Sequence, residues 1–67
     1  MELSRLTKAY AFKHQEGDEV IRLLYIGEER GWHQFVKEED RFGTVLSELL
    51  PSDLWMLVEI GDANLER

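Results

Sequence analysis

The sequence has no cysteine, one proline and no long hydrophobic run among its 67 residues. Without cysteine the protein forms neither a disulfide nor a thiolate metal site, which is compatible with a reducing compartment. No segment approaches the roughly 20 apolar residues that a membrane-spanning helix requires. Residues 1–12 also lack the apolar core of a secretory signal. We therefore expect a cytoplasmic protein that has no membrane partner.

Basic residues are scarce as well, and this shortage limits the classes of partner. The chain carries 8 Lys and Arg against 14 Asp and Glu, a net charge of −6. Residues 1–14 hold three basic and one acidic side chain (+2), which leaves five basic and thirteen acidic (−8) for residues 15–67. Repulsion from phosphate argues against direct nucleic-acid binding, whereas a basic protein would be attracted. The simpler interpretation is a solvated surface that keeps the protein in solution.

Motifs with known chemistry are absent from the sequence. The two histidines, His14 and His33, have no H-E-x-x-H spacing, and no serine stands in a G-x-S-x-G context. The five glycines form neither a G-x-G-x-x-G fingerprint nor a P-loop. A chain of this length also has little room for a pocket that excludes water. We therefore predict no catalytic residue, no metal site and no cofactor.

The length suits one domain, residues 1–67, with a polar tail at residues 62–67. A domain of this size buries only about 60% of the surface that its unfolded chain exposes. Small domains without disulfides or metals gain further burial by associating with another chain. We therefore expect a partner chain to contribute to stability.

Two segments predict a β-hairpin at the start of the chain, the first from its alternating side chains and the second from its β-branched and large apolar residues. They are residues 4–14 and residues 19–28, and Gly17 stands in the turn signal between them. The turn sets a register in which Tyr10 faces Leu23, Phe12 faces Ile21 and Ala9 faces Leu24.

A second turn, of two residues, at Arg30-Gly31 predicts a third strand from Trp32 to Lys37. A slip of one residue would turn every side chain of this strand to the other face of the sheet. The predicted pairs of the third strand with the second are Phe35 beside Ile26 and Val36 beside Tyr25.

The only clear helical period lies between residues 42 and 49. It is formed by Phe42, Val45, Leu46 and Leu49. Pro51 ends the period, and the acidic residues 38–40 suit the positive end of a helix. Residues 54–60 then alternate as a strand does. We expect the helix to be the core element, with Leu46 at its centre.

These elements predict an α+β fold in the order strand, strand, strand, helix, strand (βββαβ). A right-handed crossover through the helix places the last strand beside the first and parallel to it. The result is a small mixed sheet of three to four strands with one helix packed on one face, similar in layout to a β-grasp.

The predicted sheet has one shallow face, with Ala9, Ala11 and Leu24, that the helix can cover. With one helix in the chain nothing covers the opposite face, and an apolar area of that extent marks an interface. We predict that it forms a homodimer or binds a protein partner through Tyr10, Phe12, Ile21, Leu23, Tyr25, Trp32 and Trp55. The alternative is that the sheet twists strongly and that the tail, long side chains and the third strand cover this face.

Clustered carboxylates at the turns and at the helix start predict a second contact surface. They are Glu16, Asp18, Glu19, Glu28, Glu29, Glu38, Glu39 and Asp40. Residues 38–40 also have a simpler role, because acidic side chains stabilise a helix start. As a stripe, the eight carboxylates would resemble the phosphate row of a nucleic acid, as in small acidic phage-type inhibitors.

The resulting hypothesis is a non-catalytic acidic protein-binding module that inhibits a basic, nucleic-acid-handling enzyme by charge mimicry. One alternative is a structural or accessory subunit of a larger assembly, whose acidic residues keep it soluble. A more remote alternative is a single-stranded nucleic-acid binder, since aromatic side chains on strands stack bases, although that mode needs a positive groove.

Overall fold

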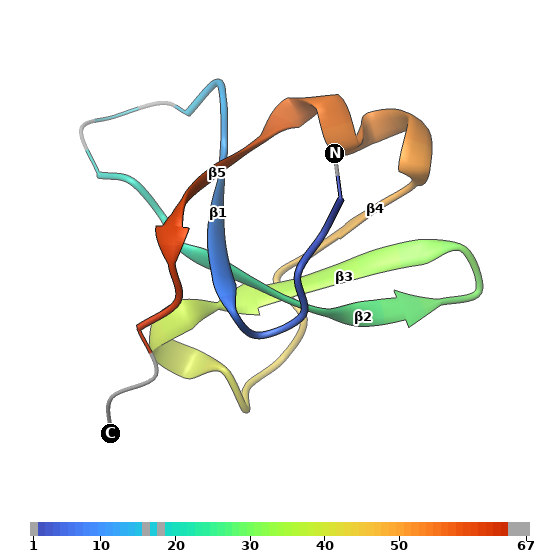
Figure 1. The fold of residues 1–67 in the computed structure, drawn as a ribbon, viewed down its shortest axis with the longest axis horizontal. Helices are drawn as coiled ribbons and strands as arrows, with labels where there is room; N and C mark the ends of the chain where they lie inside the picture. The colour runs from blue at the N-terminus through green and yellow to red at the C-terminus, as the bar shows by residue number, and fades with distance from the viewer. Residues whose placement is uncertain (1, 16, 18, 65–67) are drawn as a thin grey trace.

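The computed structural model describes residues 2–15, 17 and 19–64, which form one five-stranded antiparallel sheet (Figure 1). The strands are β1 (Lys8–Phe12), β2 (Leu23–Glu29), β3 (Trp32–Lys37), β4 (Ser47–Leu49) and β5 (Leu57–Asp62). Two short 3-10 segments join them, η1 (Glu38–Asp40) and η2 (Pro51–Met56). The strand order is β4-β3-β2-β1-β5, so the first four strands form a meander and β5 returns to pair with β1.

The predicted α+β fold class is wrong, because the described residues contain no α-helix and every strand pairing is antiparallel. The last strand does lie beside the first, as expected, but it runs in the opposite direction. In the ladder, β4 and β5 both run opposite to β1, so the chain does not reverse between them, whereas the predicted helix required a reversal before the last strand. The sheet is therefore not mixed, and no helix packs on it.

The segment predicted as a helix divides into an exposed loop and a strand. The Leu46 backbone N–H donates to the Phe35 carbonyl (2.8 Å), and β4 then continues the ladder along β3. An isolated helix of eight residues is marginal in water, and Gly43 weakens it further. Pairing with the open edge of β3 provides the hydrogen bonds for the backbone N–H and C=O groups of this segment instead. Leu46 is consequently 48% exposed and not a core centre, whereas Leu49 is buried.

The predicted final strand begins three residues later than expected. Pro51 opens η2, where its fixed φ suits the first position, and the Asp53 N–H donates to the Leu50 carbonyl (2.8 Å). Residues 54–56 therefore belong to this 3-10 segment, and the strand starts at Leu57.

The predicted hairpin register between β1 and β2 is confirmed. Tyr10 pairs with Leu23 and Ala9 pairs with Leu24. The third strand, Trp32–Lys37, is also confirmed with its predicted bounds.

The turn before β3 has the geometry that two-residue hairpins favour. Arg30 and Gly31 both have positive φ, 54° and 86°. This is the pattern of a type I′ turn, whose twist matches that of the flanking strands.

A β-bulge changes the pairing of β2 with β3 midway along the strands. Gly27 pairs with Gln34 in the predicted register, but Tyr25 pairs with Phe35 because Ile26 is left over. The predicted pairs of Phe35 with Ile26 and of Val36 with Tyr25 are therefore wrong by one residue. Since a shift of one residue exchanges the two faces, the bulge brings Phe35 to the same face as Tyr25.

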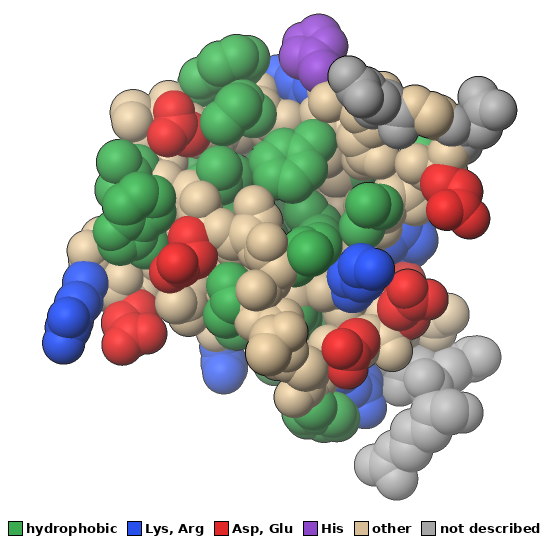
Figure 2. Space-filling model, turned by 180° about the vertical axis from the view of Figure 1, so that it is seen from behind, with side chains coloured by type: hydrophobic (Ala, Val, Ile, Leu, Met, Phe, Trp, Pro, Cys, Tyr) green, Lys and Arg blue, Asp and Glu red, His purple; other side chains and the backbone are tan. Residues whose placement is uncertain are grey.

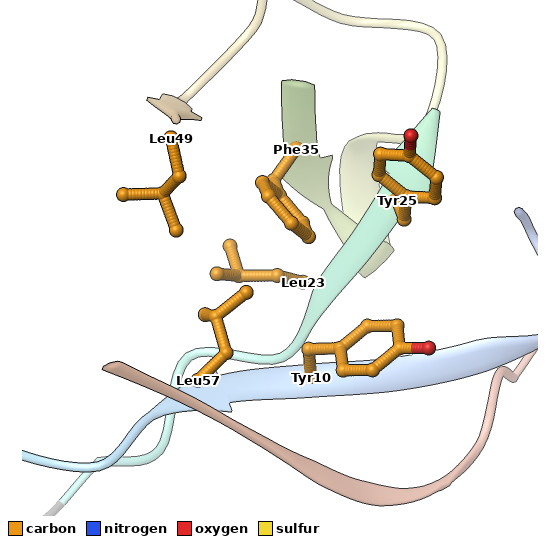
Figure 3. Packing of buried hydrophobic residues seen from close by; sticks show 6 residues of the cluster. All are labelled: Tyr10, Leu23, Tyr25, Phe35, Leu49 and Leu57. Carbon is orange, nitrogen blue, oxygen red and sulfur yellow. The ribbon is translucent and has the colours of Figure 1, made fainter. Parts of the chain in front are cut away.

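This face is the hydrophobic core, which receives side chains from all five strands (Figure 3). The Phe35 ring packs against Tyr10 at 6.3 Å and against Tyr25 at 5.4 Å between centroids. The Tyr10 hydroxyl accepts a hydrogen bond from the Ser4 N–H (2.8 Å). The cluster consists of Tyr10, Leu23, Tyr25, Phe35, Leu49 and Leu57, with Leu54 and Met56 of η2 packed against it.

The face predicted to lie open is thus covered by the rest of its own sheet. Tyr10 and Leu23 have no exposed surface, and Tyr25 is 9% exposed. These three side chains are core residues of the monomer, which corrects their predicted exposure. The sheet curls over the core, and β4 and η2 cover this face, which the sequence pattern leaves open because it assigns the helix to the opposite face.

Part of the predicted polar tail is tied to the sheet. Asp62 belongs to β5, and the Ala63 N–H donates to the Thr7 carbonyl (3.0 Å). The Asn64 N–H donates to the Glu38 carboxylate (2.9 Å). Residues 65–67 of the predicted tail lie outside the described residues.

Candidate functional site

Two loops, one before β2 and one before β4, expose large apolar side chains, in addition to the exposed Trp32, Leu50, Trp55 and Val58 elsewhere. Val20 and Ile21 are exposed in the first loop, and Phe42, Val45 and Leu46 in the second. Phe42 is 90% exposed, and the Arg41 guanidinium lies 5.0 Å from its ring centroid. Figure 2 shows hydrophobic side chains across the middle of one face of the molecule, with acidic side chains spaced around them.

The two loops meet at a shallow cavity of ≈ 310 Å³, which we call the apolar groove. Leu23, at its base, is a buried core residue, and Ile21 and Leu46 belong to one loop each. The lining residues are Phe12, Gln15, Glu19, Ile21, Leu23 and Leu46. The groove is therefore apolar at its base and polar on the side of Gln15 and Glu19.

The Gln15 side chain links the two ends of the loop that borders the groove. Its amide N–H donates to the Phe12 carbonyl (3.4 Å), and its amide oxygen accepts from the Ile21 N–H (3.2 Å). Phe12 and Ile21 both line the groove. Gln15 therefore positions Phe12 and Ile21 relative to one another.

A second cavity, of ≈ 290 Å³, shares Glu19 and Ile21 with the groove and also has Glu38 and Glu39 in its lining. Glu38 is engaged in the fold through a two-pronged ion pair with Arg22, Nε to Oε1 at 2.8 Å and Nη2 to Oε2 at 3.1 Å. The hydrogen bonds from Arg22 hold the pKa of the Glu38 carboxyl below its ordinary value of 4.5, although burial opposes this shift. Glu19 and Glu39 remain exposed beside the groove.

The predicted acidic residues do not lie in one stripe. Glu28 and Glu29 stand at one end of β2, while residues 38–40 follow β3 at the other end, where Leu23 pairs with Lys37. The seven-residue strand between these ends spans about 20 Å. Glu16 and Asp18 lie outside the described residues. The described carboxylates therefore do not form one row: Glu19 lines the groove, Glu38 and Glu39 line the adjoining cavity, and Glu28 and Glu29 lie at the far end of β2.

The predicted apolar contact residues are also divided. Phe12 and Ile21 come together in the groove. Trp32, at the start of β3, and Trp55, in η2, are exposed, but neither lines the groove. Sequence reasoning missed Leu46 as a surface residue, because its helical period assigned it to the core. Gly43 and the few residues between Leu46 and Pro51 were the sequence signals against a long helix.

A polar cluster at the β2–β3 hairpin was not predicted. The Tyr25 hydroxyl lies 2.8 Å from His33 Nδ1, and His33 Nε2 lies 4.0 Å from the Glu28 carboxylate. Burial raises the pKa of the Tyr25 hydroxyl above its ordinary value of 10.0, and the charge of Glu28 adds to this effect. The hydroxyl thus stays protonated, which suits a structural hydrogen bond and not a nucleophile. The predicted register of the second and third strands already paired Glu28 with His33. This pairing was the sequence signal from which the cluster could have been predicted.

Among residues 2–15, 17 and 19–64, no group of three or more His, Asp or Glu side chains is placed to hold a metal ion. Within the same residues no helix has the length and apolar character of a membrane span. No protein-family model matches the sequence, and neither the curated proteins nor the solved structures contain a match.

Proposed function

We propose that this chain is a non-catalytic module that binds a basic protein partner. The observation that supports the proposal is the exposure of apolar side chains in the loop before β4, where Phe42 is 90% exposed. Val45 and Leu46 follow in the same loop, and Leu46 reaches the apolar groove. Exposed apolar side chains grouped in this way mark an interaction surface.

These side chains contribute little to the folded monomer. Full burial of one Leu- or Phe-sized side chain is worth about 1.5–3 kcal/mol; nearly all of this is unrealised at Phe42, which is 90% exposed, and roughly half at Leu46, which is 48% exposed. A partner that covers the loop would recover it. The apolar loop is therefore of use mainly in a complex.

The charge of the chain indicates which partner it would accept. A net charge of −6 attracts basic surfaces and raises the rate of encounter with them at low salt. Glu19 and Glu39, both exposed, place part of this charge beside the groove. Because the described carboxylates do not form one row, contact with a few cationic side chains is favoured over imitation of a continuous phosphate row.

A test is capture of the partner from the source cell, followed by binding measurements with two variants of equal net charge. Glu19→Gln with Glu39→Gln removes two charges beside the groove, and Glu28→Gln with Glu29→Gln removes two at the hairpin. We expect the first variant to weaken binding and flatten its salt dependence, while the second stays close to the wild type. Capture of nucleic acid, or of a complex whose affinity is independent of salt, would contradict the proposal.

A further inference from the structure

We infer that the apolar groove is an anchor site for a short linear segment of the partner, in which one large apolar side chain is flanked by Lys or Arg. This inference rests on the proposed function and adds the place and the chemistry of the contact. It concerns the groove between Phe12, Ile21 and Leu46, above the core residue Leu23.

The size of the groove suits a single side chain. Sites for small molecules have volumes of about 300–1,000 Å³ and enclose most of their ligand. The groove, at ≈ 310 Å³, lies at the lower limit and is open on one side. An apolar side chain that projects from a longer segment fits this shape, because the rest of the segment stays outside.

The polar residues of the groove determine what flanks the anchor. Gln15 is already engaged, since its amide bonds Phe12 and Ile21. No hydrogen bond or ion pair within the described residues engages Glu19, so its carboxylate is available to a cation at the rim. Glu39 borders the adjoining cavity, which shares Glu19 and Ile21, and provides a second cation position.

The walls of the groove are held in place before any partner arrives. Gln15 bridges the ends of the first loop, and the Leu46 N–H is bonded to the Phe35 carbonyl at 2.8 Å while the Leu46 side chain is 48% exposed. Binding then requires little ordering of the backbone at Ile21 and Leu46, which favours a short segment with few contacts.

A second copy of this chain is a poor occupant. Each copy carries a net charge of −6, so association through the groove would bring Glu19 and Glu39 of both copies together. Such association would strengthen as salt rises. Binding of a basic segment would weaken under the same change, so salt dependence separates the two occupants.

The experiment is a positional-scanning library of short synthetic peptides, probed with the wild-type chain and with two single variants. Leu46→Asp places a charge in the groove, and Trp55→Asp places one at an exposed site outside it. We expect the wild type to select a large apolar residue at one position with Lys or Arg at its sides. Leu46→Asp should lose about tenfold or more in affinity for the selected peptide, a factor typical of one buried anchor, and Trp55→Asp should not.

A second variant guards against a folding defect in the first. Ile21→Asp alters the opposite wall, and both variants change exposed residues, so backbone NMR spectra should retain the wild-type dispersion. Selection of acidic flanks, absence of any apolar position, or equal loss in Trp55→Asp would overturn the inference. Salt-promoted dimerisation that Leu46→Asp abolishes would also overturn it.

The failure of this inference is distinguishable from that of the proposed function. If the captured partner binds Leu46→Asp and Ile21→Asp as it binds the wild type, the groove is not the site, but protein binding stands. If capture returns no basic protein partner, the proposed function itself fails.

Discussion

The β2–β3 hairpin and the chain from residue 41 to residue 57 differ in how far local sequence decides their structure. In the hairpin, Arg30 and Gly31 form a two-residue turn whose dihedral angles suit only one kind of strand pairing. In the later segment, the apolar residues fit a helical period as well as a short strand. The open edge of β3 decides between the two, because it offers hydrogen bonds to residues 46–49. Apolar spacing alone is therefore weaker evidence than turn geometry.

The largest expected effect contrasts one phenylalanine from each region. Phe35 is fully buried among Tyr10 and Tyr25, so Phe35→Ala should cost about 3–5 kcal/mol of stability. Phe42 is 90% exposed, so Phe42→Ala should change the free energy of unfolding by no more than about 0.5 kcal/mol. Urea denaturation of both variants measures the difference. Similar losses in the two would show that the second loop belongs to the core.

A smaller effect is expected at the hairpin turn. Gly31 has a φ of 86°, where a Cβ atom is unfavourable, although nothing lies within 4 Å of the added atom. Gly31→Ala should therefore cost about 1–2 kcal/mol through backbone strain alone. Arg30→Gly, at the neighbouring position with a φ of 54°, is the opposite control and should not add strain. Full stability in Gly31→Ala would contradict a turn-determined register.

The polar cluster of the hairpin should contribute about as much as one ordinary hydrogen bond. Tyr25→Phe keeps the ring against Phe35 but removes the hydroxyl that bonds His33 Nδ1. The expected loss is about 0.5–1.5 kcal/mol. Thermal denaturation measures it, with His33→Phe as a second variant that removes the other partner. A gain in stability in either variant would argue that the cluster serves binding and not the fold.

The smallest expected effect is on how stability depends on pH. It comes from the ion pair of Glu38 with Arg22, which lies between the two regions. The pair lowers the pKa of Glu38 in the folded state below 4.5, so its contribution is present above that pH and is lost as pH falls through the folded value. Wild-type stability should therefore decrease in acid more steeply than that of Glu38→Gln. Denaturation at a series of pH values between about 3 and 7 compares the slopes. Parallel curves would exclude Glu38 as a source of acid sensitivity.

The candidate site shows the same division between local and tertiary information. Phe12 and Ile21 were predicted as contact residues from the hairpin register, and they line the groove. Leu46, on the other wall, was assigned to the core because its spacing is helical. The sequence pattern assigned Tyr10, Leu23 and Tyr25 to the surface because the one predicted helix covered the opposite face of the sheet. Which face of a strand is exposed depends on elements far away in the sequence, and so the pattern within one strand does not determine it.

By itself the sequence determined the features that depend on neighbouring residues. These are the turn at Arg30-Gly31, the strand that follows it, the pairing of Tyr10 with Leu23, and the acidic character of residues 15–67. The tertiary structure alone decided that residues 47–49 form a strand, that the bulge at Ile26 turns Phe35 inward, and that the sheet covers its own apolar face. The physical reason is that backbone hydrogen bonding to a strand edge and burial against other strands outweigh local helical preference in so short a segment.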